Sequence, residues 1–314
     1  MNKLKMIDLF AGIGGFHQAA KKTNKIDIVY ASEIDPDSSL VYKENHKINA
    51  FSDITTTAEE NIPEHDILCA GFPCQAFSVA GKRMGFKDTR GSLFFDVARI
   101  AKYHQPKVLF LENVKGLLNH DKGRTFQVIL NTLDEIGYTV FFQILNTYKH
   151  GNLPQNRERI YIVAFRKDLE VTNFNFPDEV KLTNCFKNFI KRNEKVEEKY
   201  YYNERFKIFD KIKNEITLYD TAYQWRRKYV RANKNNVCPT LTANMGTGGH
   251  NVPLIIDDFG IRKLTPKECL KLQGFDENFN TCNLSDSKIY KQSGNSVSIP
   301  VINNIFNNIL NIIF

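Results

Sequence analysis

The sequence predicts an α/β protein with a doubly wound, largely parallel, Rossmann-like sheet and a second, smaller and irregular domain. From residue 4 to about 165, short apolar runs alternate with helical stretches, which is typical of successive strand and helix units. Between about 180 and 260 this alternation gives way to polar, basic and irregular sequence. We therefore expect one domain over 1–180, a second over 181–262, and a hinge with a return to the first domain over 263–314.

Each predicted element rests on its residue pattern. Apolar runs of four to eight residues predict buried strands, and apolar residues at helical spacing predict helices. Strands are expected at 6–10, 26–30, 67–70, 108–111, 139–146 and 159–165, and helices at 15–22, 37–45, 92–104 and 125–136. The last two strands leave no room for a long helix between them, so we expect an antiparallel excursion at one edge of the sheet.

The C-terminal part contains two further predicted helices. Thr265, Pro266 and Glu268 form an N-cap, a first-turn proline and a capping-box acid, which predict a short helix that ends at Gly274. Residues 298–314 predict an apolar helix that packs back on the first domain.

The net charge of +8 is concentrated in one region. Residues 181–234 hold 15 Lys or Arg against 7 Asp or Glu, which accounts for the whole excess. Such a patch attracts a polyanion, although a run of charges is more often a solvated surface. Tyr223, Trp225 and Tyr229 lie among these basic residues, and rings and guanidinium groups stack on bases, which favours nucleic acid as the partner.

The composition argues against several classes of protein. No run of 18 uncharged apolar residues is present and the N-terminus leads directly into a strand, so we expect a cytoplasmic protein without a membrane segment or signal peptide. The six cysteines show neither C-x-x-C pairs nor the dense spacing of a secreted framework. They predict reduced thiols and no structural metal.

Residues 71–78, GFPCQAFS, place Cys74 just beyond the predicted strand 67–70. A lone cysteine is more often a small buried side chain than a catalyst. Here glycine and proline end the strand sharply and present the thiol at the carboxyl edge, where open α/β sheets bind their ligands. The reacting species is the thiolate, so a catalytic Cys74 needs cationic or dipolar neighbours.

A glycine-rich turn, DLFAGIGGF at residues 8–16, follows the first strand. It departs from G-x-G-x-x-G because His17 occupies the third glycine position, which counts against a pyrophosphate. Glu33, about 20 residues further on, can accept hydrogen bonds from ribose hydroxyls, and Asp53 can contact an adenine amino group. A nucleoside without phosphates, such as S-adenosylmethionine, fits better than NAD; a tight turn without a ligand is the alternative.

Three charged residues follow or precede other predicted strands. Glu112 comes directly after the strand 108–111, so it shares the rim with Cys74, although such an acid is more often a helix cap or solvated. Arg157 precedes the last strand and Arg159 begins it, and alternation places both side chains on the same side. They can serve a thiolate, a carbonyl oxygen or a phosphate, or merely form an exposed, salt-bridged strand start.

The ordered set of motifs resembles the bacterial cytosine-C5 DNA methyltransferases of restriction-modification systems over nearly the whole chain. In chain order the motifs are DLFAGIGGF, Glu33, Asp53, GFPCQAFS, RGSLFFDVARI, ENV, QNRERIYIV, RKLTPKECLKLQGF and QSGNSVSIPV. The resemblance implies a cofactor site for S-adenosylmethionine formed by Phe10, Gly12, Ile13, Gly14, Glu33, Ile34, Asp53, Pro73, Leu93 and Asn295. Ile34 stands where many relatives place an aromatic residue, so it would pack on adenine without ring stacking.

The resemblance also implies the catalytic residues, which are Cys74, Glu112, Arg157 and Arg159. The Cys74 thiolate would attack C6 of cytosine while Glu112 holds N3 and the exocyclic amine. Arg159 would hold the O2 carbonyl and Glu112, and Arg157 would help to position Cys74 and the base. The target base must first rotate out of the duplex, since none of these groups reaches a stacked base.

Double-stranded DNA is the implied substrate, recognised by the region 181–262 and by the loop after Cys74. The expected DNA-binding residues are Ser78, Lys82, Arg83, Arg226, Arg227, Arg231, Thr242, Gly248 and Gly249. A partner restriction endonuclease is implied without a required complex, and we expect a monomer. A catalytically silent DNA-binding relative and an RNA (tRNA) cytosine methyltransferase are the alternatives.

Overall fold

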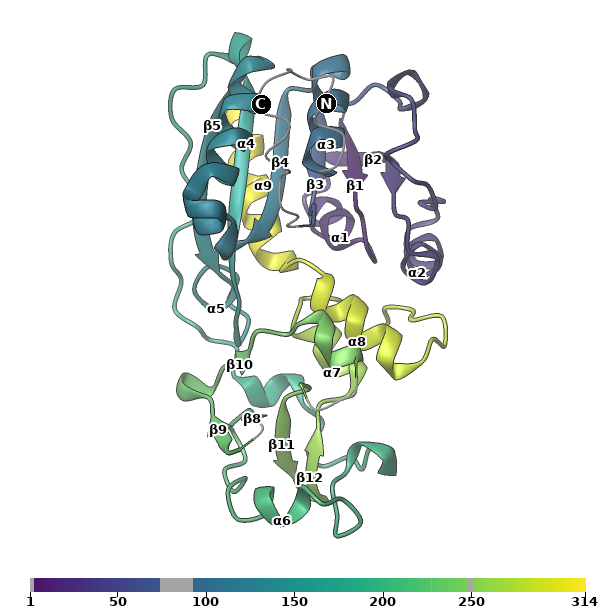
Figure 1. The fold of residues 1–314 in the computed structure, drawn as a ribbon, viewed down its shortest axis with the longest axis vertical. Coiled ribbons are helices and arrows are strands. Elements are labelled where there is room, and N and C mark those ends of the chain that lie inside the picture. The colour runs from purple at the N-terminus through teal and green to yellow at the C-terminus, as the bar shows by residue number, and fades with distance from the viewer. Residues whose placement is uncertain (1–2, 74–92, 227, 248–250) are drawn as a thin grey trace. The chain divides into compact units, whose positions relative to one another are not determined.

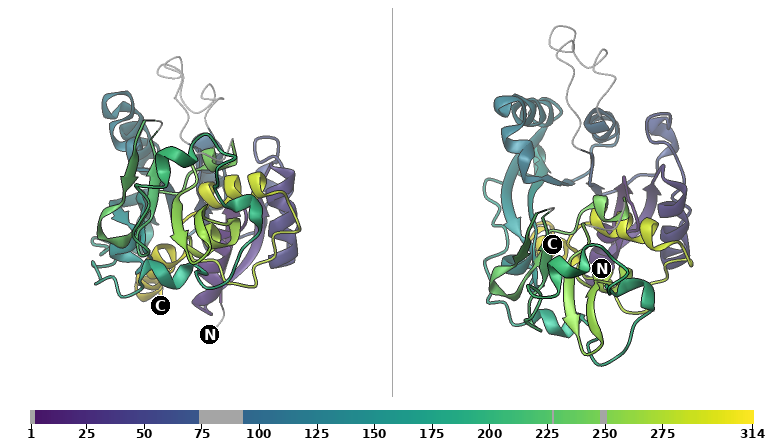
Figure 2. Two further views of the ribbon diagram at one scale, coloured as in Figure 1. Left: turned by 90° about the horizontal axis from the view of Figure 1, so that it is seen from below. Right: turned by 60° about the horizontal axis from the view of Figure 1, so that its bottom comes forward.

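The computed structural model describes residues 3–73, 93–226, 228–247 and 251–314, and the chain divides into two compact units. Unit 1 comprises Met1–Leu145, Glu158–Pro177 and Ile302–Phe314, and unit 2 comprises Asn146–Arg157 and Asp178–Val301. The elements of each unit can be followed in Figure 1 and, from two further directions, in Figure 2.

This division differs from the predicted domains in two places. The segment Asn146–Arg157 belongs to unit 2, because β6 (Gln155–Asn156) pairs in parallel with β10 (Cys238–Pro239). The return to unit 1 begins at Ile302, so most of the predicted C-terminal part from residue 263 also belongs to unit 2. Local sequence patterns show neither the pairing of β6 with β10, which are far apart in the sequence, nor the residue at which the chain returns to unit 1.

Within the described part of unit 1, six strands form one sheet in the order β2-β1-β3-β4-β7-β5 (Figure 1). They are β1 (Leu4–Leu9), β2 (Ile26–Ser32), β3 (Ile67–Ala70), β4 (Val108–Val114), β5 (Tyr138–Asn146) and β7 (Glu158–Arg166). Strand β1 pairs in parallel with β2 and β3, and β3 pairs in parallel with β4. Strand β7 runs antiparallel to β4, which confirms the predicted antiparallel excursion.

Helices cover both faces of this sheet. They are α1 (Gly15–Lys22), α2 (Pro36–His46), α3 (Leu93–His104), α4 (Arg124–Glu135) and α9 (Ile299–Ile313). Side chains alternate along β4: Leu109 and Leu111 pack with α3 and α4, whereas Phe110 lies 5.2 Å from Phe16 of α1 and 5.1 Å from Phe306 of α9, ring centre to ring centre. The sheet is therefore doubly wound, and the C-terminal helix packs on unit 1 as predicted.

Unit 2 is more regular than its sequence suggests. Its described residues form a four-stranded sheet in the order β12-β11-β8-β9, with antiparallel neighbours throughout. The elements are α5 (Thr147–His150), α6 (Phe209–Ile212), β8 (Tyr223–Trp225), β9 (Val230–Ala232), β11 (Leu254–Asp257), β12 (Gly260–Lys263), α7 (Pro266–Lys271) and α8 (Asp286–Asn295). The strands have three or four residues each, too short for a clear alternation of apolar and polar residues. Across all the described residues, no helix combines the length and apolar character needed to span a bilayer.

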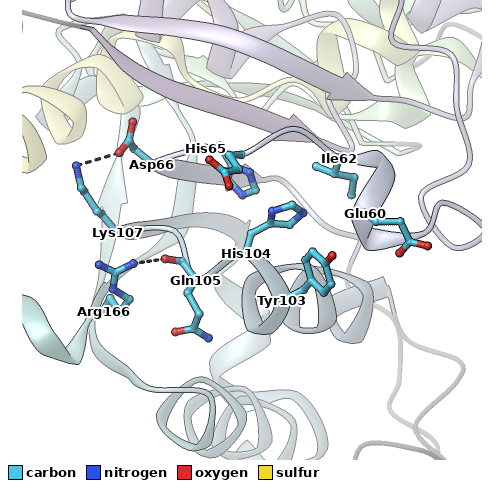
Figure 3. A pocket seen from close by; sticks show the side chains of 10 residues that line it. Glu60, Ile62, His65, Asp66, Tyr103, His104, Gln105, Lys107 and Arg166 are labelled. Carbon is cyan, nitrogen blue, oxygen red and sulfur yellow. Dashed lines mark hydrogen bonds and ion pairs between the residues drawn. The ribbon is translucent and has the colours of Figure 1, made fainter.

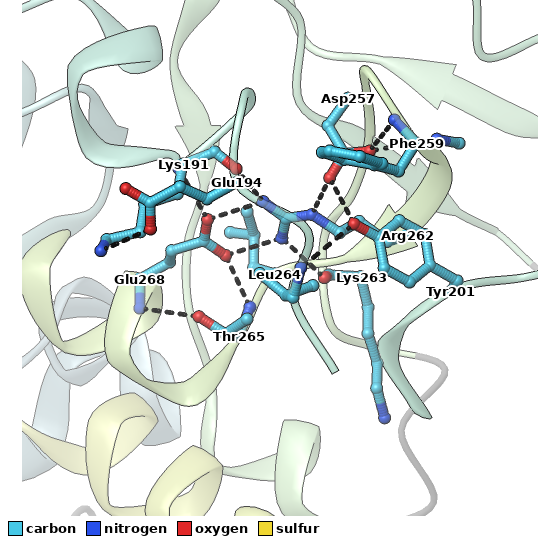
Figure 4. Close-up of polar contacts among 12 residues, drawn as sticks. Lys191, Glu194, Tyr201, Asp257, Phe259, Arg262, Lys263, Leu264, Thr265 and Glu268 are labelled. Atoms are coloured by element: carbon cyan, nitrogen blue, oxygen red, sulfur yellow. Dashed lines mark hydrogen bonds and ion pairs between the residues drawn. The ribbon is translucent and has the colours of Figure 1, made fainter. Parts of the chain in front are cut away.

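A buried charge network holds the core of unit 2 together (Figure 4). The Arg262 side chain is fully buried, and its Nε donates to Asp257 Oδ2 at 2.5 Å. Its two terminal nitrogens each lie 2.8 Å from a Glu268 oxygen. Glu268 also completes the predicted capping box with Thr265, so the network ties the start of α7 to β11 and β12.

Candidate active site

The carboxyl ends of three parallel strands meet at one edge of the unit 1 sheet. The register pairs Leu9 of β1 with Ala70 of β3, and Ala70 with Leu111 of β4. The glycine-rich turn leaves the sheet directly after Leu9, the motif at 71–73 leaves after Ala70, and Glu112 is the next residue of β4. The predicted common rim is therefore confirmed for these residues.

Several predicted site residues lie outside the described part of the chain. They are Cys74, Ser78, Lys82, Arg83, Arg227, Gly248 and Gly249. Their assignments stay predictions.

Glu112 and Arg159 form an ion pair at this edge. The Arg159 Nε lies 3.1 Å from Glu112 Oε1, and both side chains are largely buried. Antiparallel pairing sets Glu112 opposite Tyr161 and Val114 opposite Arg159, so the two charged side chains are diagonal neighbours on one face of the sheet. The pair offers a carboxyl group and a guanidinium group in a largely buried position. Hydrogen bonds from these groups to a bound polar molecule are stronger there than in water.

Asn113 was not singled out by the sequence, although it lies next to Glu112. Its buried amide Nδ2 donates to the Phe72 carbonyl at 2.8 Å, and its Oδ1 accepts from the Val114 amide at 2.8 Å. The pairing of β3 with β4 ends at Ala70, so this side chain extends the link between the two chain segments by two residues. Asn113 thus fixes the segment that leads to Cys74.

The glycine-rich turn is held open by backbone conformations that glycine favours. Gly12 and Gly14 have φ values of 55° and 89°, and Phe10 also adopts a positive φ of 55°. The Gly12 amide donates to Glu33 Oε2 at 2.7 Å, and the Asp35 amide donates to Glu33 Oε1 at 2.8 Å. Burial raises the pKa of Glu33, and these two amides partly oppose the shift. A carboxylate accepts about four hydrogen bonds, so Glu33 keeps capacity for further donors.

Two exposed apolar side chains lie close to Glu33 in the chain or the sheet. Ile34 is 63% exposed, and Phe51, which forms a parallel bridge with Glu33, is 58% exposed. The sequence analysis included Ile34 but missed Phe51, because an isolated bridge has no periodic signal. Asp53 lies two residues beyond Phe51, where its Oδ1 accepts from the Thr55 amide and hydroxyl.

The remaining residues of unit 1 that were predicted to bind the cofactor differ in their exposure. Ile13 is buried, Pro73 is exposed, and Leu93 is half-buried at the first turn of α3. Asn295 lies in unit 2 at the end of α8 and is exposed.

Arg157 lies in unit 2 and is almost fully buried. Its Nη1 donates to the Leu241 carbonyl at 2.8 Å and its Nη2 to the Ser296 carbonyl at 2.5 Å, while both lie 3.3 Å from the Gly294 carbonyl. These hydrogen bonds join the segment at Leu241 to the segment 294–296. The two segments are in close contact, because a Cβ at Gly294 would collide with the backbone of Thr242.

The structure changes the interpretation of the two arginines. The alternation from which one shared face was predicted does not extend to Arg157, because β7 begins at Glu158. Arg159 contacts Glu112, whereas the Arg157 hydrogen bonds go to backbone carbonyls that flank Asn295. A contact of Arg157 with the target base stays a prediction.

Some of the basic and aromatic residues of unit 2 lie on the short hairpin of β8 and β9. Arg226 directly follows β8, the Arg226 amide donates to the Tyr229 carbonyl, and Arg231 lies in β9. Arg226, Arg231 and Tyr229 are exposed, the last by 60%. Thr242 is also exposed, at the start of a single helical turn. This hairpin therefore presents cations and a ring to solvent.

A polar hollow of about 520 Å³ lies elsewhere in unit 1 (Figure 3). Its lining includes Asp66 and Lys107, which directly precede β3 and β4 and form an ion pair of 2.9 Å. It therefore lies at the amino ends of these strands, opposite the edge that carries Glu112. The hollow is not part of the candidate active site.

The geometry alone does not identify the class of enzyme, and the comparison with protein families does. The C-5 cytosine-specific DNA methylase family matches residues 4–311. The chain belongs to this family.

Curated members of this family resemble the chain over almost its full length. The type II methyltransferase M.Bsp6I of Bacillus sp. (strain RFL6) is 48% identical over 309 residues, which is 98% of each chain. The type II methyltransferase M.HhaI of Haemophilus parahaemolyticus is 39% identical over 318 residues, 98% of this chain and 94% of that protein.

Solved structures resemble the methylase fold at low sequence identity. A DNMT2 mutant from Spodoptera frugiperda has a TM-score of 0.77 with 21% identity, covering 98% of this chain and 100% of the other. The Dnmt2 methyltransferase of S. pombe has a TM-score of 0.75 with 20% identity, covering 98% and 99%. These likenesses support the fold.

As a member of this family, the methylase uses S-adenosylmethionine as its methyl donor. The residues at the carboxyl edge fit such a ligand. A Cβ at Gly12 would meet no atom within 4 Å, so the turn leaves open space, and Glu33 offers acceptors for ribose hydroxyls. Ile34 and Phe51 expose apolar surface of the kind that a base covers.

Proposed function

We propose that this methylase transfers a methyl group from S-adenosylmethionine to C5 of a cytosine rotated out of a short recognition sequence in double-stranded DNA. The observation that carries the proposal is the Glu112–Arg159 pair at the carboxyl edge, on the strand next to the one that leads to Cys74. A carboxyl group and a guanidinium group together match the N3, amine and O2 edge of cytosine.

The chemistry needs both an attacking thiolate and stabilisation of charge in the ring. The Cys74 thiolate bonds to C6, while Glu112 holds N3 and the exocyclic amine and Arg159 holds O2, which stabilises the charge that enters the ring. Bound S-adenosylmethionine supplies the methyl group that C5 then takes. Loss of the C5 proton to a base and elimination of the Cys74 thiolate restore the aromatic ring and the free enzyme.

We assign the cofactor to the turn after β1 and its neighbours. Glu33 accepts from the ribose hydroxyls, Asp53 accepts from the adenine amine, and Ile34 packs on the base. Phe51 is added to the predicted set because it exposes a ring beside Glu33. The other members are Phe10, Gly12, Ile13, Gly14, Pro73, Leu93 and Asn295.

Unit 2 carries the proposed DNA recognition. The exposed Arg226 and Arg231 of the β8–β9 hairpin contact phosphates or guanine edges, and Thr242 lies on a neighbouring segment of the recognition region. Binding should weaken steeply with salt, because phosphate contacts release counterions. Rotation of the base out of the duplex costs a few kcal/mol, which contacts with the protein offset.

The named relatives also suggest a biological setting. They are type II methyltransferases, so we propose that this chain protects host DNA in the cytoplasm against a partner restriction endonuclease. We propose further that it acts as a monomer and needs no complex with that endonuclease.

Transfer of a labelled methyl group tests the proposal. The chain should label duplex DNA but not tRNA, Cys74→Ala should abolish the transfer, and Glu112→Gln should slow it by about 100-fold, since charge stabilisation of this kind is worth that much. Labelling of tRNA in preference to DNA would support the RNA alternative. Full activity of Cys74→Ala would contradict the mechanism.

A further inference from the structure

We propose that His46 is a positioning residue of the cofactor site, and that it holds the glycine-rich turn through the Ile13 carbonyl. The inference rests on the proposed function, because it takes this turn to bind S-adenosylmethionine. His46 is the last residue of α2, 33 positions away from Ile13 in the sequence.

The contact between ring and turn is direct. His46 Nε2 lies 3.3 Å from the Ile13 carbonyl oxygen, and since a carbonyl only accepts, Nε2 carries the hydrogen. On the other side of the same peptide, a Cβ at Gly14 would collide with the His46 ring. Glycine at position 14 therefore permits both the positive φ and the close approach of the His46 ring.

A second histidine fixes the orientation of the first. The His17 ring of α1 stacks on the His46 ring with centroids 4.0 Å apart and planes 20° apart. His17 Nδ1 in turn lies 2.9 Å from the hydroxyl of Tyr42, which is fully buried. The Tyr42 and His46 ring centroids also lie 4.6 Å apart with the planes inclined by 65°, so the imidazole contacts rings from both α1 and α2.

The charge state of the pair suits this role. Burial lowers the pKa of His46 to about 4 and that of His17 to about 3, so both rings are neutral at pH 7. The titratable and charged groups around them are Asp8 of β1, Lys21 of α1 and Tyr42 of α2. A neutral ring with its hydrogen on Nε2 is a stable donor to the Ile13 carbonyl.

The turn transmits this contact to the cofactor residues. The Gly12 amide, one residue before Ile13, donates to Glu33, which is the proposed ribose acceptor. Loss of the His46 contact would let the Gly12–Gly14 backbone move away from Glu33. His46 should therefore affect cofactor affinity, and the rate at saturating cofactor much less.

The test measures binding of S-adenosylmethionine and of S-adenosylhomocysteine by isothermal titration calorimetry. His46→Leu removes the donor, and we expect Kd to rise about 10-fold while kcat at saturating cofactor stays within about twofold. His46→Gln keeps an N–H donor at similar reach and should recover most of the affinity. His65→Leu is the matched control, because burial lowers the pKa of His65 to about 4 as it does for His46, yet His65 contacts the Pro63 carbonyl and not the turn.

Further variants distinguish a misfolded protein, a wrong role for His46 and a wrong cofactor site. If His46→Leu does not fold, His46→Gly with added imidazole replaces it, and imidazole should restore the affinity. An unchanged Kd in folded His46→Leu, or equal losses in His65→Leu, would overturn the inference. Glu33→Ala tests the proposed site itself: unchanged cofactor binding in that variant would refute the site, whereas a loss there with no effect at His46 would refute only the role of His46.

Discussion

Arg157 and Arg159 are two residues apart, and the chain uses their guanidinium groups differently. Arg159 forms an ion pair with Glu112 at the edge of the unit 1 sheet. Arg157 donates hydrogen bonds to the backbone carbonyls of Leu241, Gly294 and Ser296. Five donors in a rigid plane suit this second task, because several carbonyls can be held at once. Arg157 therefore positions the segment that carries Asn295.

The Asn113 amide gives a prediction at the scale of one hydrogen bond. Asn113→Ala should lower kcat by about 10-fold with a small effect on the KM for S-adenosylmethionine, because the chain before Cys74 loses its anchor at the Phe72 carbonyl. Steady-state kinetics with labelled cofactor measure both constants.

A matched control exists for this variant. Asn303 of α9 also donates to a backbone carbonyl, that of Ala19 at 3.0 Å, and Ala19 belongs neither to the glycine-rich turn nor to the Cys74 motif. Asn303→Ala should keep kcat. Equal losses of kcat in both variants would show a general effect on stability instead of positioning.

At the scale of elements, local pattern predicted most of unit 1. The predicted strand ends at residues 10, 70 and 111 placed the glycine-rich turn, the segment that leads to Cys74, and Glu112 at one edge, and the register confirms this for the described residues. The contacts of Asn113, His46 and Arg157 were not predictable, because each joins segments at least 33 residues apart in the sequence. The strands of unit 2 escaped detection for a different reason, because three or four residues are too few to show an alternation of apolar and polar side chains.

The Arg262 network gives a prediction for α7. Glu268→Ala should lower the free energy of unfolding by about 3–5 kcal/mol, because it leaves Arg262 buried with one carboxylate fewer and removes the capping box. Urea unfolding measures this. Glu277→Ala is the control, since Glu277 pairs with Lys271 on the surface; a similar loss there would contradict the role of burial.

At the scale of the whole molecule, the excess of basic residues and the histidines with lowered pKa values lie in different units. The basic excess at 181–234 lies in unit 2, with the proposed DNA-binding hairpin. Unit 1 contains Asp8 at the strand before the glycine-rich turn, and burial raises the pKa of Asp8 well above its usual range, with the charge of Glu33 adding to the shift. His17, His46 and His65 have pKa values lowered by burial to about 3, 4 and 4.

These histidines make stability depend on pH. Their pKa values are near 6.5 in the unfolded chain and lower in the folded one, so the unfolded chain binds more protons between about pH 4 and 6.5. Each histidine should therefore remove stability as the pH falls through this window, at up to about 1.4 kcal/mol per pH unit. Asp8 and Glu33 act with the opposite sign, because their folded pKa values are raised.

A difference between variants isolates one histidine. His65→Asn keeps a donor for the Pro63 carbonyl but does not titrate, so the slope of its unfolding free energy between pH 5 and 6.5 should be smaller than that of the parent. Urea unfolding at several pH values measures both slopes. Identical slopes would show that His65 has an ordinary pKa in the folded chain.

The most direct measurement uses duplex DNA that contains 5-fluorocytosine at the target position. Fluorine replaces the C5 proton that must leave, so the bond between Cys74 and C6 should persist after methyl transfer. We predict a covalent protein–DNA complex that forms only with S-adenosylmethionine present and that peptide mapping assigns to Cys74. Absence of a complex under conditions that methylate ordinary DNA, or attachment through another residue, would contradict the mechanism.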